Sequence, residues 1–154
     1  NIKAERIKAC SQYILKKLNS SLSKILKLPV SKARKKLNLI PGVGAKTADV
    51  LLSNIYGSKE VLVIDTHMRR LALRLGLVEK NASYNKTQHA LSDFIPWDKI
   101  SKRKHELFVS LLWLLAKHTC RAIKPKCGEC SLKNICKFCN QLSWKTSKKE
   151  YYKG

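Results

Sequence analysis

Four cysteines near the end of the chain are spaced closely enough to hold one metal centre. They read Cys120-x6-Cys127-x2-Cys130-x5-Cys136. Thiolates bind zinc and iron–sulfur clusters, and on spacing alone a tetrahedral zinc site is slightly favoured. However, only Cys127 and Cys130 form the C-x2-C pair of a zinc knuckle, and wider spacings suit the corners of a cubane. The residues alone therefore leave both kinds of centre open.

A glycine-containing turn, Pro41-Gly42-Val43-Gly44, is suited to bind an anion. Pro41 has no N–H and a fixed φ, so the helix before it must end. Gly42 and Gly44 permit backbone angles that other residues avoid and allow another backbone to approach closely. A new helix is expected from Ala45, and its first N–H groups have no partner within the helix. These groups and the turn amides together form a pocket for an anion.

A position at the start of a helix would change the chemistry of two residues. They are Lys46, just after this turn, and Asp65, further along the chain. Lys46 lies in the first turn of the new helix, where the positive end of the dipole disfavours its ammonium form. Partial burial or nearby cations would act in the same direction, and a neutral amine is a nucleophile. Asp65 is at an N-cap position, where backbone N–H groups keep a carboxylate ionised. From position alone, the simplest interpretation is that Lys46 is a surface charge and that Asp65 is a structural cap.

The elements that position these residues are predicted to be helices, so the predicted fold class is all-α. Apolar spacing and end signals predict helices over Ala4 to about Leu18, Lys32 (with Ser31 as cap) to about Asn38, Ala45 to Gly57, the residues after Asp65 to Gly76, Ser83 to about Phe94, and Asp98 to about Lys117, the longest. The apolar run at residues 61–64 has no partner strand, so we expect a buried connection. Arg69, Arg70 and Arg74 lie off the expected inner face of their helix and are expected at the surface, where cations can contact the phosphates of a polyanionic partner.

The charge of the chain indicates a polyanionic partner. Lys and Arg number 32 against 10 acidic residues, which gives a net charge of +22. This charge is spread over every segment, which is typical of nucleic-acid binding and not of one basic helix on a membrane. No apolar run approaches the ~18 residues of a membrane span, and no signal peptide is recognised. We therefore expect a cytoplasmic protein beside the nucleoid, or a nuclear one, where cysteines rarely form disulfides.

Three motifs resemble those of the endonuclease III family of DNA glycosylases. Residues 39–48 read L-I-P-G-V-G-A-K-T-A, similar to the family's helix-hairpin-helix pattern L-P-G-V-G-x-K-T-A, and residues 64–67 resemble its V-D-T-H. The spacing of the four cysteines is similar to the family's [4Fe–4S] loop, and Cys139 lies outside that pattern. The resemblance spans about residues 4–136. It departs from the family by one extra residue around positions 57–60.

The resemblance implies a function and a set of site residues. It implies a helix-hairpin-helix glycosylase domain in residues 1–95, and a long helix, a [4Fe–4S] loop and a basic tail in residues 96–154. The implied function is that of a bifunctional DNA glycosylase and AP lyase in base excision repair, with damaged pyrimidines in double-stranded DNA as the implied substrate. Lys46 would attack C1′ of the damaged nucleotide and form a Schiff base that leads to β-elimination, and Asp65 would stabilise the charge on the sugar. The residues expected to contact DNA are Pro41, Gly42, Val43, Gly44, Ala45, Arg121, Lys124 and Lys126.

Two alternatives are weighed against this interpretation. In monofunctional mismatch glycosylases of the adenine or thymine type, the position of Lys46 resembles serine or tyrosine, so Lys46 argues against that class. A non-catalytic iron–sulfur module that only binds DNA phosphates would share the turn and the cysteines.

The N-terminal end of the resemblance carries a further expectation. The family's helical domain starts upstream of the residues that positions 1–5 resemble. We therefore expect missing N-terminal helices, supplied by another segment or chain, and poor base excision by residues 1–154 alone. The basic and aromatic residues 137–154 are expected either to pack over the cluster or to fray.

Overall fold

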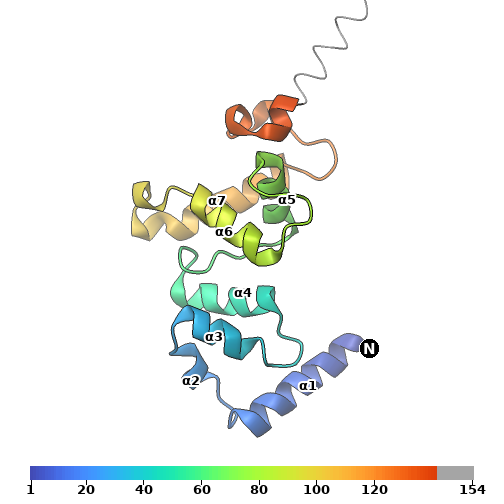
Figure 1. The fold of residues 1–154 in the computed structure, drawn as a ribbon, viewed down its shortest axis with the longest axis vertical. Helices are drawn as coiled ribbons and strands as arrows, with labels where there is room; N and C mark the ends of the chain where they lie inside the picture. The colour runs from blue at the N-terminus through green and yellow to red at the C-terminus, as the bar shows by residue number, and fades with distance from the viewer. Residues whose placement is uncertain (142–154) are drawn as a thin grey trace, which may run out of the picture. The chain divides into compact units, whose positions relative to one another are not determined.

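The computed structural model describes residues 1–141, which are helical and contain no β-strand (Figure 1). The all-α fold class is therefore confirmed. The chain forms two compact units, residues 1–63 and residues 64–154. The sequence analysis instead divided the chain between residues 95 and 96, at the boundary between its motifs, and that division stays a prediction. Within the described range, no helix has both the length and the apolar character needed to cross a membrane.

The first unit is a set of helices around one apolar core. Its helices are α1 (Ile2–Lys17), α2 (Ser23–Leu26), α3 (Val30–Leu37) and α4 (Ala45–Tyr56). α3 packs against both α2 and α4. The buried core residues are Ile25, Ala33, Leu37, Ile40, Ala48, Leu52 and Val61. Ile40 directly precedes the glycine-containing turn, so its burial anchors that turn to the core.

Two helix starts in this unit differ from prediction. α1 begins at Ile2, because the Asn1 side chain accepts a hydrogen bond from the Lys3 N–H and caps the helix. The expected cap at Ser31 is wrong, since α3 begins at Val30 after Pro29 and has no side-chain cap bond. Pro29 has no N–H that a helix start would leave without a partner, so it suits this position.

The second unit contains α5 (Thr66–Leu75), α6 (Tyr84–Phe94) and α7 (His105–Leu114). The predicted inner face of α5 is confirmed, and its buried residues are Met68, Leu71, Ala72 and Leu75. Gly76 ends α5 in the left-handed conformation with a φ of 87°, which favours glycine. Residues 61–64, before α5, are largely buried and have no regular structure, as predicted for a connection.

The predicted long helix from Asp98 to Lys117 is wrong. Short 3-10 turns, η1 (Trp97–Lys99) and η2 (Lys102–Lys104), precede α7, and a π-helical turn, η3 (Leu115–Thr119), follows it. Ile100 is extended, and its carbonyl bonds a ring nitrogen of His105 at 2.9 Å. A side chain thus takes the carbonyl that a continuous helix would bond through its backbone.

Candidate functional site

The glycine-containing turn is closed by one backbone bond, from the Val43 N–H to the Ile40 carbonyl at 3.0 Å. Gly42 has a φ of 82°, and a Cβ there would lie 3.3 Å from the Cβ of Arg6. Gly42 therefore meets both expectations, a left-handed angle and a close approach. For Gly44 the expected special angle is wrong, since its φ is −91° and its surroundings are open.

The start of α4 offers the predicted anion-binding amides. The Ala48 N–H donates to the Gly44 carbonyl at 3.0 Å. The preceding N–H groups of Ala45, Lys46 and Thr47 are those that an α-helix leaves without an internal acceptor. Gly44 is the N-cap residue of α4 and supplies no side chain to satisfy them. The first turn of α4 can therefore accept an anion from outside the protein.

Lys46 lies in the first turn of α4, as predicted, and its side chain is exposed. The partial burial that was considered for this amine does not occur. The reason is the phase of α4, which turns Ala48, Asp49 and Leu52 into the core and Lys46 away from it.

An ion pair that the sequence analysis missed joins the two helices beside the turn. Arg34 Nε of α3 lies 2.6 Å from Asp49 Oδ1 of α4, and the Asp49 side chain is 0% exposed. A buried carboxylate is costly unless it is paired, so this contact fixes the two helices to each other. The available signal was an acidic residue on the otherwise apolar face of α4.

Asp65 is the N-cap residue of α5 in the second unit, as predicted. Its Oδ1 accepts hydrogen bonds from the N–H groups of His67 and Met68 at 2.9 and 2.8 Å. Its Oδ2 accepts the indole N–H of Trp113 at 2.8 Å. Burial alone would raise the pKa of Asp65, but the bonds from Met68, Trp113 and His67, with the charge of His67, lower it overall. This carboxylate is thus held ionised and oriented.

Arginines of α5 bind the backbone that leads into the cysteine loop. Arg70 donates from Nε to the Cys120 carbonyl at 2.8 Å and from Nη2 to the Ala116 carbonyl at 2.6 Å. Arg70 Nη2 also lies 3.1 Å from His67 Nδ1. The expectation that Arg70 is a surface residue facing DNA is therefore wrong, since its guanidinium is used within the unit.

Arg74 has a similar role one turn further along α5. It donates to the carbonyls of Cys120, Arg121 and Ala122 at 3.2, 2.7 and 3.1 Å. Its Nη1 is also 3.4 Å from Cys120 Sγ, and its guanidinium lies over the Phe138 ring. The surface expectation is wrong for Arg74 too. Sequence spacing gave no signal for these contacts, because the partners are backbone carbonyls 46 to 48 residues away.

The four predicted metal-ligating cysteines line one cavity with apolar walls, and Cys139 lines it too. Burial and then the charges of other cysteines raise the pKa of Cys127. Burial also raises the pKa of Cys130, against a backbone hydrogen bond at Leu132 that lowers it, and the charges of other cysteines add to the rise. A cationic centre bound by all four cysteines, an iron–sulfur cluster or zinc, would stabilise them as thiolates. Among the described residues, no group of three or more His, Cys, Asp or Glu side chains converges closely enough for a single metal ion.

The basic loop between the first two of these cysteines is exposed, as predicted for a DNA contact. Arg121 donates to the Lys124 carbonyl at 3.0 Å, and Lys126 pairs with Glu129 at 3.3 Å. Lys124 has a φ of 49°. The tail expected to pack over the cluster or fray lies outside the described residues from position 142 onward.

Comparisons with protein families match both parts of the chain. Residues 1–96 match the family described as "HhH-GPD superfamily base excision DNA repair protein". Residues 120–136 match the "Iron-sulfur binding domain of endonuclease III". The second match begins and ends at predicted cysteine ligands, Cys120 and Cys136, and excludes Cys139.

Similar individual proteins carry the name endonuclease III. The chain is 34% identical to endonuclease III of Thermotoga maritima over 143 residues, 88% of this chain and 57% of that protein. Two solved structures are 26% identical, with TM-scores of 0.68 and 0.69 over 92% of this chain. They are described as a non-covalent endonuclease III–DNA complex and a trapped endonuclease III–DNA covalent intermediate. The chain covers 59% and 60% of those structures, so it spans less than two thirds of these relatives.

Proposed function

The chain belongs to the HhH-GPD superfamily of base excision DNA repair proteins, and from this premise we propose that it acts as a bifunctional DNA glycosylase and AP lyase. The substrate class is double-stranded DNA with an oxidised pyrimidine or an abasic site. The observation that carries the proposal is the pair of reactive groups at two helix starts. Lys46 follows the anion-binding turn at the start of α4, and Asp65 is an ionised cap at the start of α5.

The proposed reaction begins with a base that has left the stack. The Lys46 amine, in its neutral form, attacks C1′ of the deoxyribose, and the C1′–N bond to the base breaks with its electron pair going to the base. Asp65 stabilises the positive charge that develops on the sugar and accepts the proton from the Lys46 nitrogen. The ring oxygen then leaves C1′ as the sugar opens, which gives the Schiff base.

The Schiff base leads to strand cleavage. It acidifies the C2′ proton, and loss of that proton expels the 3′ phosphate by β-elimination. Hydrolysis then releases Lys46.

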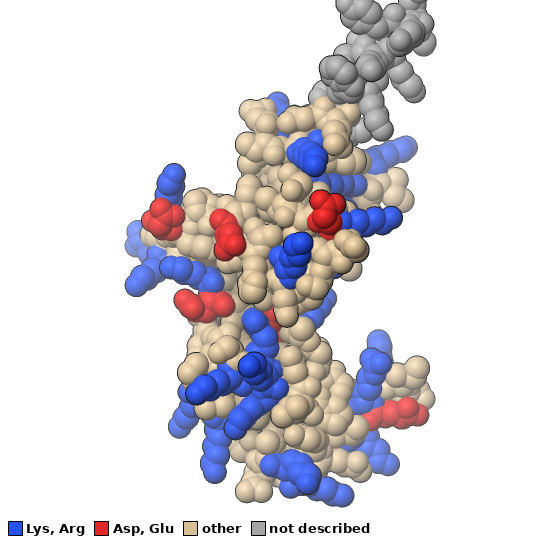
Figure 2. Space-filling model, viewed as in Figure 1, with Lys and Arg blue, Asp and Glu red and all other residues tan. Residues whose placement is uncertain are grey.

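The proposed DNA contacts use the backbone and the surface charge. The N–H groups of Gly42 and Gly44 and those of the first turn of α4, which begins at Ala45, would hold one phosphate, while the Val43 N–H stays bonded to the Ile40 carbonyl. Other phosphates of the DNA would be contacted by the basic loop residues Arg121, Lys124 and Lys126. Figure 2 supports these contacts only in general terms, because basic side chains clearly outnumber acidic ones on the face shown. These contacts position the duplex and carry no base information. Action on chromosomal DNA would place the protein in a prokaryotic cytoplasm or a nucleus.

We further propose that the iron–sulfur centre is a [4Fe–4S] cluster bound by Cys120, Cys127, Cys130 and Cys136. The family match at residues 120–136 and the spacing of the cysteines favour this cluster over zinc. When bound, the cluster would supply structural rigidity to the basic loop and no step of the reaction. Cys139 lines the same cavity but lies outside the matched residues.

Borohydride trapping on abasic DNA tests the reaction. Reduction of the Schiff base should leave a covalent protein–DNA adduct that resists denaturation. Lys46→Gln should abolish it, whereas the matched change Lys59→Gln, at another exposed lysine, should leave it intact. An undiminished yield of adduct with Lys46→Gln would mean that another residue is the nucleophile. Base release without an adduct would indicate a monofunctional glycosylase, and binding without either reaction would indicate a DNA-binding module.

A further inference from the structure

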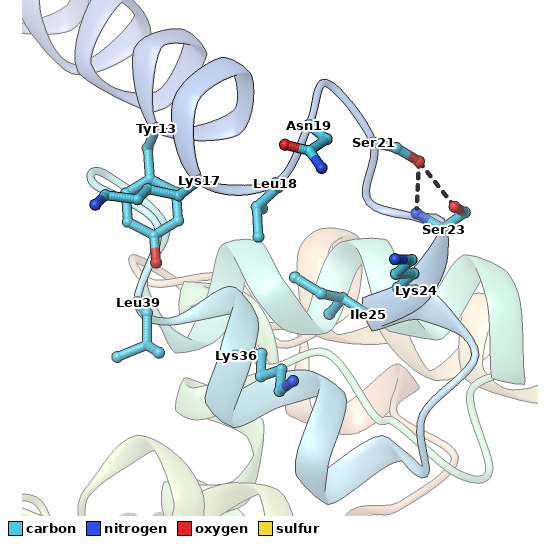
Figure 3. Close-up of a pocket in the computed structure, with 10 residues that line it drawn as sticks. All are labelled: Tyr13, Lys17, Leu18, Asn19, Ser21, Ser23, Lys24, Ile25, Lys36 and Leu39. Carbon is cyan, nitrogen blue, oxygen red and sulfur yellow. Dashed lines mark hydrogen bonds between the residues drawn. The ribbon is translucent and has the colours of Figure 1, made fainter.

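A cavity of about 540 Å³ opens in the first unit beside the C-terminal end of α1 (Figure 3). Its walls come from α1, the turn after it, α2 and the end of α3. None of the residues from Pro41 to Ala45 lines it, so it is distinct from the anion-binding turn. Small-molecule sites usually measure about 300–1,000 Å³. The cavity is therefore large enough for a ligand the size of a nucleotide.

The charges around this cavity are all positive. Lys17, Lys24 and Lys36 line it from three different helices (Figure 3), and no acidic residue is among the lining residues. None of these lysines belongs to an ion pair found in the described part of the chain. Three ammonium groups without a neighbouring carboxylate favour an anion, which would also relieve their mutual repulsion.

Neutral hydrogen-bonding groups lie along one side of the cavity. The Ser21 hydroxyl lies 2.8 Å from the Ser23 hydroxyl and accepts the Ser23 N–H at 3.2 Å. Asn19 also lines the cavity, at a turn where its φ is 48°. Hydroxyl and amide groups can donate to phosphate oxygens, as lysines do. The polar side therefore suits a phosphate in particular among anions.

Apolar side chains form the rest of the cavity. Leu18 and the buried Ile25 lie along it, and the Tyr13 ring and Leu39 lie at one end (Figure 3). Leu39 is 67% exposed although its neighbour Ile40 is buried. A planar base stacks well on an aromatic ring, and every base has a face that can do so. An apolar wall beside three lysines thus fits a phosphate that carries a base.

We propose that this cavity binds a nucleotide through its phosphate group, with the lysines on the phosphate and Tyr13 and Leu39 against the base. The nucleotide is either free or part of a DNA strand, since both present the same chemistry. The site requires neither Lys46 nor Asp65, so it does not depend on the glycosylase proposal.

Calorimetric titration with thymidine 5′-monophosphate tests the site, and thymidine and inorganic phosphate are the comparison probes. A variant with Lys17→Gln, Lys24→Gln and Lys36→Gln should weaken binding of the monophosphate by about tenfold or more, because charge-assisted contacts are lost. The matched variant carries Lys16→Gln, Lys27→Gln and Lys35→Gln, at exposed lysines outside the cavity. It has the same net charge and should bind as the parent protein does. Thymidine should bind more weakly than its monophosphate.

A single-stranded thymidine oligonucleotide distinguishes the two sources of the nucleotide. If the strand occupies the cavity, the slope of log affinity against log salt should become shallower by about 0.7 for each cavity lysine removed. The matched variant should keep the parent slope. A salt slope that becomes shallower in the cavity variant only, without binding of the free monophosphate, indicates a strand. Binding of the free monophosphate that the cavity variant loses and the matched variant keeps indicates a free nucleotide.

Two results overturn the proposal. One is an equal loss of affinity for the monophosphate in the cavity variant and the matched variant, which would mean that only the net charge of the protein matters. The other is no binding of either phosphorylated probe by the parent protein. Borohydride trapping of both variants, at low salt and saturating protein, reports on the glycosylase proposal separately.

Discussion

The two units of this protein hold their functional groups in different ways. In the first unit the candidate anion site consists of backbone amides, and one apolar core with one buried ion pair, Arg34–Asp49, supports it. In the second unit side-chain donors from distant residues add to the backbone bonds. Trp113 bonds Asp65, and Arg70 and Arg74 bind carbonyls at the start of the cysteine loop. A site made of backbone amides persists as long as its helices stay packed. A site held by side chains depends on each hydrogen bond between residues that are far apart in the sequence. We therefore expect substitutions to affect the two units differently.

Of the substitutions that compare the two units, Asp65→Asn should have the largest effect, because it separates the charge of this residue from its role as a cap. Asp65→Asn keeps an oxygen that can accept the N–H groups of His67 and Met68 but removes the negative charge. Base excision should fall by about 10²-fold or more, as it does when a charge-stabilising group is lost. DNA affinity, measured by fluorescence anisotropy, should change little. Unchanged excision would reduce Asp65 to a structural cap.

The next effect tests the buried ion pair of the first unit. Arg34→Met leaves the Asp49 carboxylate buried without its cationic partner, which should lower the free energy of unfolding by about 3 kcal/mol. Urea denaturation measures this change. Lys35→Met, at the exposed neighbouring residue, is the matched control and should change stability by less than about 0.5 kcal/mol. Equal effects of the two substitutions would mean that the core alone holds α3 to α4.

Arg74→Met tests the corresponding support in the second unit. The substitution removes hydrogen bonds to three carbonyls and to Cys120 Sγ. Because water can replace some of these partners at the exposed loop, we expect the free energy of unfolding to fall by about 2 kcal/mol. The iron content should fall from about four per chain, while the helical circular dichroism is retained. Arg69→Met, which removes one bond to the Lys80 carbonyl, should retain the iron.

The smallest expected effect is a shift in pH dependence. The pKa of Asp65 is lowered in the folded protein, so its stabilising contribution is present above its unfolded pKa and is lost as pH falls through the folded pKa. Trp113→Phe removes one of the bonds that lower this pKa, so the pKa should rise toward its ordinary value. The acidic limb of the pH–activity profile should then move to higher pH. An unmoved limb would show that the two backbone bonds alone hold the charge.

The features that could be predicted from the sequence are those whose signals are local. Pro41 and the glycines marked the turn, Asp65 and Gly76 marked the two ends of α5, and apolar spacing gave the inner face of α5. The cysteine spacing marked the iron–sulfur loop, which the family comparison matches. These features depend on neighbouring residues along the chain, where steric limits and helix periodicity act directly.

Only the tertiary structure decided the contacts between distant residues. The pairing of Arg34 with Asp49, the bond from Trp113 to Asp65 and the use of Arg70 and Arg74 on loop carbonyls join residues 15 to 50 positions apart. Nothing in the type of an arginine says whether it meets solvent, DNA or a carbonyl of its own chain. The break in the predicted long helix also went unpredicted, although it involves a bond over only five positions, between the His105 ring and the Ile100 carbonyl. Such bonds form because folding leaves a donor and an acceptor facing each other away from competing water, and local sequence does not encode that arrangement.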